Sequence, residues 1–311
     1  MSPNANDYIG IDVASDRLDV AGAEPAQVPN EPRALRRWLE ALKRTQPQAH
    51  LVCEATGRHH RALQVAAAQA AVPLSIINPR QARDLARSLG QLEKTDAVDA
   101  QLLRRLGQAL QPAPSHLPAA VLRELQDLVG LRTAVVEEQT AWGNRQALLG
   151  PTAAKLCARR LRTLERELVL LEEAIAALLA TPAAAELSAK TQTLCLVCGV
   201  GVRTAVVLVA WLAELGSCNR RQIAKLAGLA PLNRDSGQWR GQRHIAHGRA
   251  PVRKALYQAA VVAARHNEHL RPFYQRLRAS GKPAKVAYVA VARKLLVFLN
   301  RILSDATPTT A

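Results

Sequence analysis

The chain has 311 residues, of which 49% are hydrophobic, so it is long enough for two domains with buried cores. Its 42 Lys and Arg against 25 Asp and Glu give a formal net charge of +17. That excess favours a polyanionic partner, with nucleic acid ahead of an anionic membrane surface. No stretch of about eighteen residues is apolar and uncharged, and the short polar N-terminus does not resemble a secretory signal. We therefore expect a cytoplasmic protein with no membrane partner.

The cysteine content also favours a cytoplasmic protein. Five cysteines in a chain of this size do not form a disulfide framework, which fits a reducing compartment. Cys195 and Cys198 have the spacing of half a zinc site, but no second Cys or His pair follows at a matching interval. A zinc site there is therefore a minor alternative to two thiols in an apolar segment.

The first segment, residues 1–110, alternates short apolar runs with helical patterns, which predicts an α/β domain. The helix after residue 31 is indicated by Pro32, a favoured first helical residue, and by apolar residues at helical spacing behind it. The expected strands are 8–12, with 18–21 as its hairpin partner, 50–53 and 74–77. One expected helix begins at Pro32, and three further helices are expected over residues 62–70, 81–89 and 96–106.

The second segment, residues 111–187, is predicted to be helical. Leucine and isoleucine recur there at spacings of three and four, and charged residues fill the other faces (Leu161, Leu164, Leu168, Leu171, Ile175, Leu178). A break at Gly150-Pro151 separates this helix from an earlier one. The pattern suits a coiled coil or an antiparallel helix pair. It serves either as packing within the chain or as an oligomerisation arm.

Four acidic residues of the first segment occupy positions where a charged side chain calls for an explanation. Asp12 and Glu54 end two apolar strands, while Asp96 and Asp99 lie three apart at the start of a helix and so share a face. Each has an ordinary explanation, since acids in a first helical turn favour the helix dipole and Asp12 could end a strand in a turn. Brought together, four carboxylates repel one another unless cations hold them, as in two-metal phosphoryl-transfer sites.

The third segment, residues 188–311, is predicted to be mostly helical and strongly basic. Between residues 220 and 254 there are nine Lys or Arg and one acid, Asp235, which favours phosphate contact. Upstream, Gly199, Gly201 and Arg203 lie in a Gly-x-Gly turn between two apolar helical runs, resembling a helix-hairpin-helix element. The other candidate nucleic-acid contacts are Arg220, Arg221, Arg234, Arg240, Arg243, Arg249, Arg253 and Lys254.

Ser236 precedes a glycine in a polar loop of this basic stretch, where a serine is usually a turn residue. As a nucleophile it would need a base or metal to remove its proton and cations to neutralise the phosphoryl oxygens. Arg234, Arg240, Arg243 and Arg249 suit the second need. The residues alone leave both interpretations of Ser236 open.

Several motifs resemble those of one family, the DEDD insertion-sequence transposases, which also include DNA invertases acting on pilin genes. In the first segment they are Tyr8-Ile-Gly-Ile-Asp-Val-Ala-Ser, Cys53-Glu-Ala-Thr-Gly-Arg, Ile77-Asn-Pro and Lys94-Thr-Asp-Ala-Val-Asp-Ala. In the third they are Gly228-Leu-Ala-Pro, Ser236-Gly, Gly241, Ile245, Gly248 and Arg253. The similarity spans nearly the whole chain and is weakest in the helical middle.

The resemblance implies a ribonuclease-H-like (RuvC-like) first domain, with a tetrad of Asp12, Glu54, Asp96 and Asp99 that binds Mg²⁺, two ions per active site. It implies that Ser236 is the catalytic serine, which links covalently to DNA in a transposase domain. It also implies a structured bridge RNA that pairs with donor and target double-stranded DNA. The active species would be a homo-oligomer, a dimer or a tetramer.

Three other functions compete with this interpretation. A RuvC-like Holliday-junction nuclease would use the same acids and metals with water as nucleophile, and would not need Ser236. Sugar-kinase-like or actin-like ATPases open with a similar strand, but the glycine-rich nucleotide loops they require are missing from the sequence. A non-catalytic nucleic-acid binder is least favoured, because all four acids and Ser236 are present.

Overall fold

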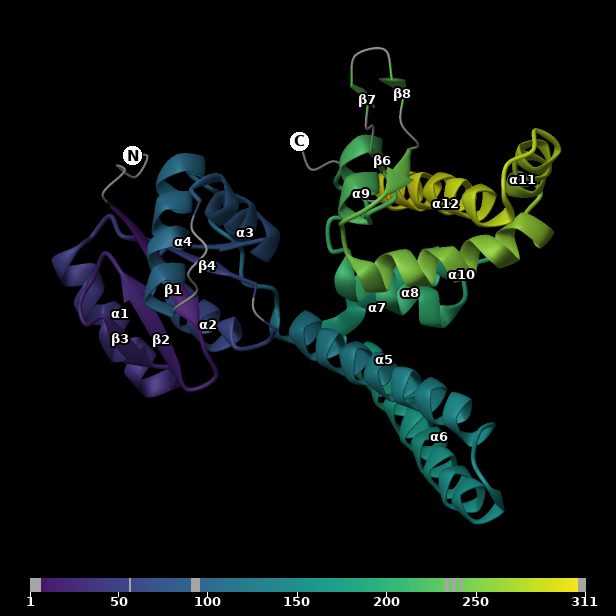
Figure 1. Cartoon of the computed structure of the whole chain (residues 1–311), viewed down its shortest axis with the longest axis horizontal. Coiled ribbons are helices and arrows are strands. Elements are labelled where there is room, and N and C mark those ends of the chain that lie inside the picture. The colour runs from purple at the N-terminus through teal and green to yellow at the C-terminus, as the bar shows by residue number, and fades with distance from the viewer. Residues whose placement is uncertain are drawn as a thin grey trace. The chain divides into compact units, whose positions relative to one another are not determined.

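The computed structural model describes residues 7–55, 57–90, 96–232, 235–236, 239–240 and 243–306. At residues 96, 97, 235, 236, 239, 240 and 306 it describes the backbone alone. The chain forms two compact units, Met1–Pro118 and Ala119–Ala311, each of which is described by itself (Figure 1).

The first unit is built on a mixed five-stranded sheet in the order β3-β2-β1-β4-β5. β1 pairs antiparallel with β2, β2 antiparallel with β3, and β1, β4 and β5 run parallel. This arrangement is compatible with a ribonuclease-H-like domain. The predicted strands are present, and β3 is an additional one. The bounds are β1 Tyr8–Val13, β2 Arg17–Ala21, β3 Gln27–Pro29, β4 His50–Glu54 and β5 Leu74–Ile77.

Helices cover both faces of this sheet because successive strand residues point to opposite sides. Ile9 and Ile11 of β1 pack with the buried residues of α1 (Pro32–Thr45) and α2 (His60–Ala70). Tyr8 and Val52 pack on the other side, with buried residues of α3 (Pro79–Ser88) and α4 (Asp96–Leu110). The sheet is therefore the middle layer of three.

The second unit begins with a helical hairpin made of α5 (Ala120–Gln146) and α6 (Pro151–Leu179), seen side by side in Figure 1. Its cross-links show an antiparallel pair: Arg132 meets Glu172 at 2.9 Å, and Arg160 meets Glu138 at 2.8 Å. Leu164 is fully buried on this seam. The heptad pattern thus pairs two helices of one chain, through the turn predicted at Gly150-Pro151.

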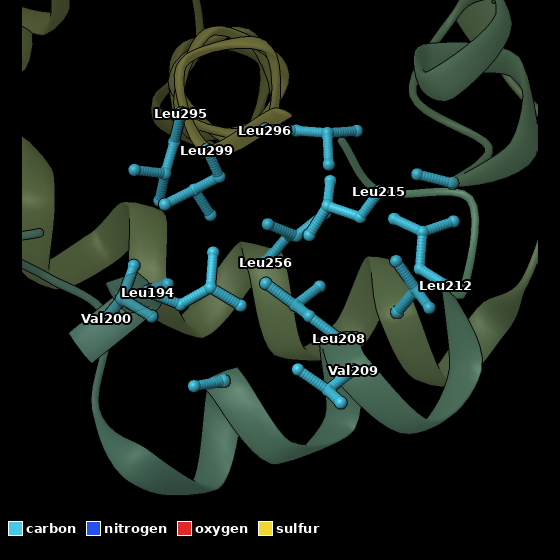
Figure 2. Close-up of a cluster of buried hydrophobic side chains, with 14 of the residues drawn as sticks. Leu194, Val200, Leu208, Val209, Leu212, Leu215, Leu256, Leu295, Leu296 and Leu299 are labelled. Carbon is cyan, nitrogen blue, oxygen red and sulfur yellow. The ribbon is translucent and has the colours of Figure 1, made fainter. Parts of the chain in front are cut away.

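The rest of the second unit is a helical bundle around one large core, whose centre Figure 2 shows. Leu208, Leu256, Leu295 and Leu299 meet there from three different helices and are fully buried. The helices are η2 Pro182–Ala184, α7 Ala185–Cys195, α8 Val202–Trp211, α9 Arg220–Leu226, α10 Ala250–His266, α11 Leu270–Ala279 and α12 Ala284–Ala306.

Between α9 and α10 the backbone forms two small antiparallel ladders where the sequence predicted a polar loop. β6 (Pro231–Leu232) pairs with β9 (His244–Ile245), and β7 (Asp235–Ser236) pairs with β8 (Trp239–Arg240). Two-residue strands give no periodic signal, which is why the sequence did not predict them.

Within the described ranges, no single helix has the length and apolar composition of a membrane span. α6 together with the segment Pro182–Cys195 satisfies both criteria, but the two are bent by 85° at the break between them.

Candidate functional site

Asp12 and Glu54 lie on neighbouring parallel strands at matching positions. β1 and β4 pair in a register that joins Ile11 to Cys53, and each acid is the next residue along its strand. Residues that follow a paired position share the same face of a sheet, so both carboxylates leave the sheet on one side. Both side chains are half-buried.

The pKa of Cys53 also indicates that Asp12 and Glu54 both lie near this residue. Burial, together with the negative charges of Glu54 and Asp12, raises the pKa of the Cys53 thiol to about 12. Cys53 is fully buried, so it is a neutral thiol at physiological pH. The two carboxylates thus concentrate negative charge at this end of the sheet.

The third element of the candidate site is α4, which packs against β1 through glycine. A Cβ on Gly10 would lie 2.0 Å from the carbonyl oxygen of Ala100, and one on Gly107 would lie 2.8 Å from the ring of Tyr8. The helix α4 therefore runs antiparallel to the strand β1. The first turn of α4, which carries Asp96 and Asp99, is directed toward the strand ends that carry Asp12 and Glu54.

The geometry brings two of the four acids together on the sheet and directs the backbone of the other two toward the same edge. Across the residues whose side chains are described, no three His, Cys, Asp or Glu gather closely enough to hold a metal ion. The side chain of Asp96 lies outside that set. Carboxylates are the ligands that Mg²⁺ favours, so the chemistry of the donor set fits the ion.

Ser236 lies in β7, opposite Trp239 of β8, on the backbone ladder between α9 and α10. Its side chain and that of Arg240 are outside the described residues, as is the whole of Arg234. Arg243, Arg220 and Arg221 are exposed, the last two in the first turn of α9.

Four predicted nucleic-acid contacts are engaged within the second unit. Arg249 makes a two-pronged ion pair with Glu214, with contacts of 2.5 and 2.7 Å, and also donates to the carbonyl of Trp211 at 3.0 Å. Arg203 meets Glu172 at 2.8 Å, Lys254 meets Glu137 at 2.7 Å, and Arg253 donates to the carbonyl of His247. These acids lie 31 to 117 residues from their partners, so no local sequence signal marks the pairs.

The two glycines of the predicted helix-hairpin-helix turn differ in what surrounds them. Gly199 has a φ of +104°, and a Cβ there would lie 2.7 Å from the Cβ of Ala263 in α10. Gly201 is the N-cap of α8, and a Cβ there would meet nothing within 4 Å. Packing against α10 thus accounts for Gly199, whereas no described atom lies close enough to exclude a side chain at Gly201.

Comparisons with known proteins cover both units. Residues 9–149 match a transposase family model of the DEDD IS110 kind, and residues 191–275 match a model described as "Transposase IS116/IS110/IS902 family". The chain is 27% identical over 322 residues to the pilin gene-inverting proteins of Moraxella lacunata and Moraxella bovis, covering 97% of each partner. It is also 27% identical over 208 residues to an insertion element IS110 protein of Streptomyces coelicolor, covering 66% of this chain and 47% of that one.

The two family models together include the residues of the candidate acidic site and the basic segment. The chain belongs to the DEDD insertion-sequence transposases and is a DNA recombinase.

Proposed function

We propose that this transposase cleaves and exchanges DNA strands with Ser236 as nucleophile and with Mg²⁺ held by Asp12, Glu54, Asp96 and Asp99. The observation that carries the metal part is the antiparallel packing of α4 on β1, which directs the acidic first turn of α4 toward the strand ends bearing the other two acids. Two bound ions would activate the attacking oxygen and neutralise charge on the leaving oxygen.

The protein side of this chemistry divides between the two units. Asp12 and Glu54 sit on rigid strands and fix one side of the cation site, while Asp99 approaches from a packed helix. The Ser236 oxygen attacks a DNA phosphorus, so a serine–phosphate bond forms and a phosphate–sugar oxygen bond breaks. The serine proton passes to solvent, and the departing DNA oxygen takes up a proton. Exposed arginines near the ladder, such as Arg243, neutralise the phosphoryl oxygens.

Substitution of Ser236 separates this proposal from a RuvC-like junction nuclease, which would use metal-activated water. We expect Ser236→Ala to abolish both cleavage and the covalent protein–DNA adduct, and Asp12→Asn to abolish cleavage without loss of DNA binding. Ser304→Ala, at an exposed serine of α12, is the matched control and should remain active. Cleavage that persists in Ser236→Ala would establish the junction nuclease instead.

The proposal also includes a structured bridge RNA that pairs with donor and target double-stranded DNA. Its support is the family resemblance and the low aromatic content of 3%, which leaves few rings to read bases by stacking. Purified protein should carry a discrete RNA, and ribonuclease treatment should stop strand exchange in Mg²⁺. Exchange that continued at an unchanged rate would remove the RNA from the proposal.

A homo-oligomer, dimer or tetramer, completes the proposal, with the α5–α6 hairpin as the contact between copies. Leu156 and Leu170 support it: they are 66% and 63% exposed on α6 and lie two heptads apart, so they share one face of the helix. Exposed leucines aligned along a helix are typical of a surface that another helix covers.

A further inference from the structure

A second concentration of positive charge lies beyond the basic stretch that the sequence analysis singled out. Between residues 265 and 294 there is one acid, Glu268, against eight basic residues. They occupy the end of α10, α11, the turn after α11 and the first half of α12, and the three helices contact one another (Figure 1). The eight are Arg265, Arg271, Arg276, Arg278, Lys282, Lys285, Arg293 and Lys294.

Within the part of the chain that the structure describes, these cations differ from those around α8 and α10 in having no carboxylate partner. Among the ion pairs that the described residues form, none involves any of the eight, whereas Arg203, Arg249 and Lys254 are all paired. Seven of the eight are exposed, Arg293 being half-buried. Unneutralised cations held close together repel one another, so an approaching polyanion relieves that repulsion.

The same helices carry three of the four tyrosines of the chain. Tyr274 stacks on Tyr288 with ring centroids 4.7 Å apart, and Tyr257 meets Tyr288 edge-on at 6.0 Å. The hydrogen bond with Tyr288 and, as a smaller cause, burial raise the pKa of Tyr274. The positive charges of Arg278 and Arg265 act in the opposite direction. The two arginines are therefore close enough to Tyr274 to act on its hydroxyl.

A neighbouring ring holds two more cations. The Arg276 guanidinium lies 5.5 Å and the Lys294 ammonium 4.6 Å from the centroid of Phe273. Contacts of this kind position a cation without cancelling its charge. Because the ring faces are occupied by one another and by cations, this surface offers charges and hydroxyls, which suit phosphates, in place of free faces for stacking bases.

We propose that the α11 surface, defined by Arg265, Arg278, Lys282, Lys285 and Tyr274, binds the phosphate backbone of double-stranded DNA. It is separate from the stretch around α9. Along α12, Tyr288 lies roughly 20 Å from Leu303, the residue against which Gly216 packs ahead of α9. The inference requires only that the transposase acts on DNA, and it depends on neither Ser236 nor the acidic tetrad.

The test is duplex binding by the full-length protein at several salt concentrations, in EDTA so that no metal-dependent chemistry intervenes. The variant Arg265→Gln/Arg278→Gln/Lys282→Gln removes three charges from the α11 surface. Each lost phosphate contact reduces the slope of log K against log salt by about one, so the slope should fall by about three. The dissociation constant at low salt should rise at least several-fold.

A matched control separates specific contact from net charge. Arg33→Gln/Arg36→Gln/Arg37→Gln removes three exposed charges from α1 and lowers the net charge equally. Equal losses in the two variants, or no loss in the first, would overturn the proposal. So would a loss confined to duplex RNA of the same length, measured in parallel.

A double variant tests the same surface in case the triple variant misfolds. Lys282→Gln/Lys285→Gln changes two exposed side chains in and beside the turn between α11 and α12. Its slope should fall by about two, with an unchanged melting temperature. An unchanged slope in this folded protein would count against the α11 surface.

Discussion

Gly10 of β1 lies directly against the backbone of Ala100 in α4, with no room for a side chain between them. This contact sets how closely the helix bearing Asp96 and Asp99 approaches the strand bearing Asp12. It also requires a residue without a Cβ at position 10, although the sequence pattern there reads only as a buried strand.

Replacing Gly10 with alanine should therefore displace α4. The new Cβ would lie 2.4 Å from the Arg104 nitrogen as well as 2.0 Å from the Ala100 oxygen, so backbone must move. We expect the free energy of unfolding to fall by about 1–3 kcal/mol, as for other overpacked cores, together with loss of strand exchange. Gly143→Ala in α5 is the control, since a Cβ there meets nothing within 4 Å and alanine favours a helix. Denaturant titration of both proteins measures the difference, and equal stability would contradict the close contact.

We expect Arg249 to stabilise the fold through its ion pair with Glu214. Burial raises the pKa of Glu214, but hydrogen bonds from Arg249 and its charge outweigh burial, so the pKa is lowered overall. A carboxyl with a lowered folded-state pKa stabilises the fold above its unfolded-state pKa and loses that contribution as pH falls through the folded value. Arg249→Gln should cost about 1 kcal/mol at pH 7, because both side chains remain more than a third exposed.

The difference between Arg249→Gln and the unsubstituted protein should shrink below about pH 4.5, near the ordinary pKa of a glutamate. Thermal melts at pH 7 and pH 4 measure it. Arg221→Gln, at an exposed residue of α9, is the companion variant, which should leave the melting temperature unchanged. A pH-independent difference would mean that Arg249 acts through something other than Glu214.

His50 should make the first unit sensitive to mild acid. It is 4% exposed, its Nε2 lies 2.8 Å from the Ser75 hydroxyl, and that hydroxyl lies within hydrogen-bond reach of the carbonyls of Pro112 and Ala113. Because the serine proton goes to a carbonyl, His50 donates from Nε2. Burial lowers the pKa of His50, so stability is full above the unfolded-state pKa near 6.5 and falls as pH drops below it.

The loss can reach about 1.4 kcal/mol per pH unit. Hydrogen exchange of the β4 amides between pH 7 and pH 5, corrected for the intrinsic rate, should show their protection weakening. His50→Gln retains a donor for Ser75 but does not titrate, so its protection should stay level over that range. A parallel decline in both proteins would assign the effect to another group.

The helical hairpin gives a prediction about assembly. Leu156→Gln/Leu170→Gln removes two exposed leucines from one face of α6 and should shift the protein toward monomer in analytical ultracentrifugation. Stability of the monomer should change by less than about 0.5 kcal/mol, because neither side chain is buried within the chain. Leu164→Gln, at a fully buried position of the same helix, should instead unfold the hairpin. An unchanged oligomer in the double variant would place the contact between copies elsewhere.

Much of the fold was predictable because its signals are local. Apolar runs marked β1, β4 and β5, Pro32 marked the start of α1, and leucine spacing with Gly150-Pro151 marked the hairpin. The ladders between α9 and α10 were not, because two-residue strands carry no periodicity.

The site shows a similar division. Strand ends and the spacing of Asp96 and Asp99 indicated which acids could share a site, and a metal site made of all four stays a prediction. The ion pair of Arg249 could not be predicted, because Glu214 becomes its neighbour only when helices far apart in sequence pack together. The importance of the α11 surface could not be predicted either, because it depends on which cations have no carboxylate partner among the described residues after folding.

The hairpin of α5 and α6 leaves the bundle and returns to it. Leu125 and Val129 near its start and Ile175 near its end belong to the bundle core, whereas the turn at 147–150 lies at the far end. Residues added to or removed from both helices in equal numbers of whole turns would lengthen or shorten the arm without moving either anchor. The length of this hairpin can thus change while the bundle core that anchors both of its ends stays the same.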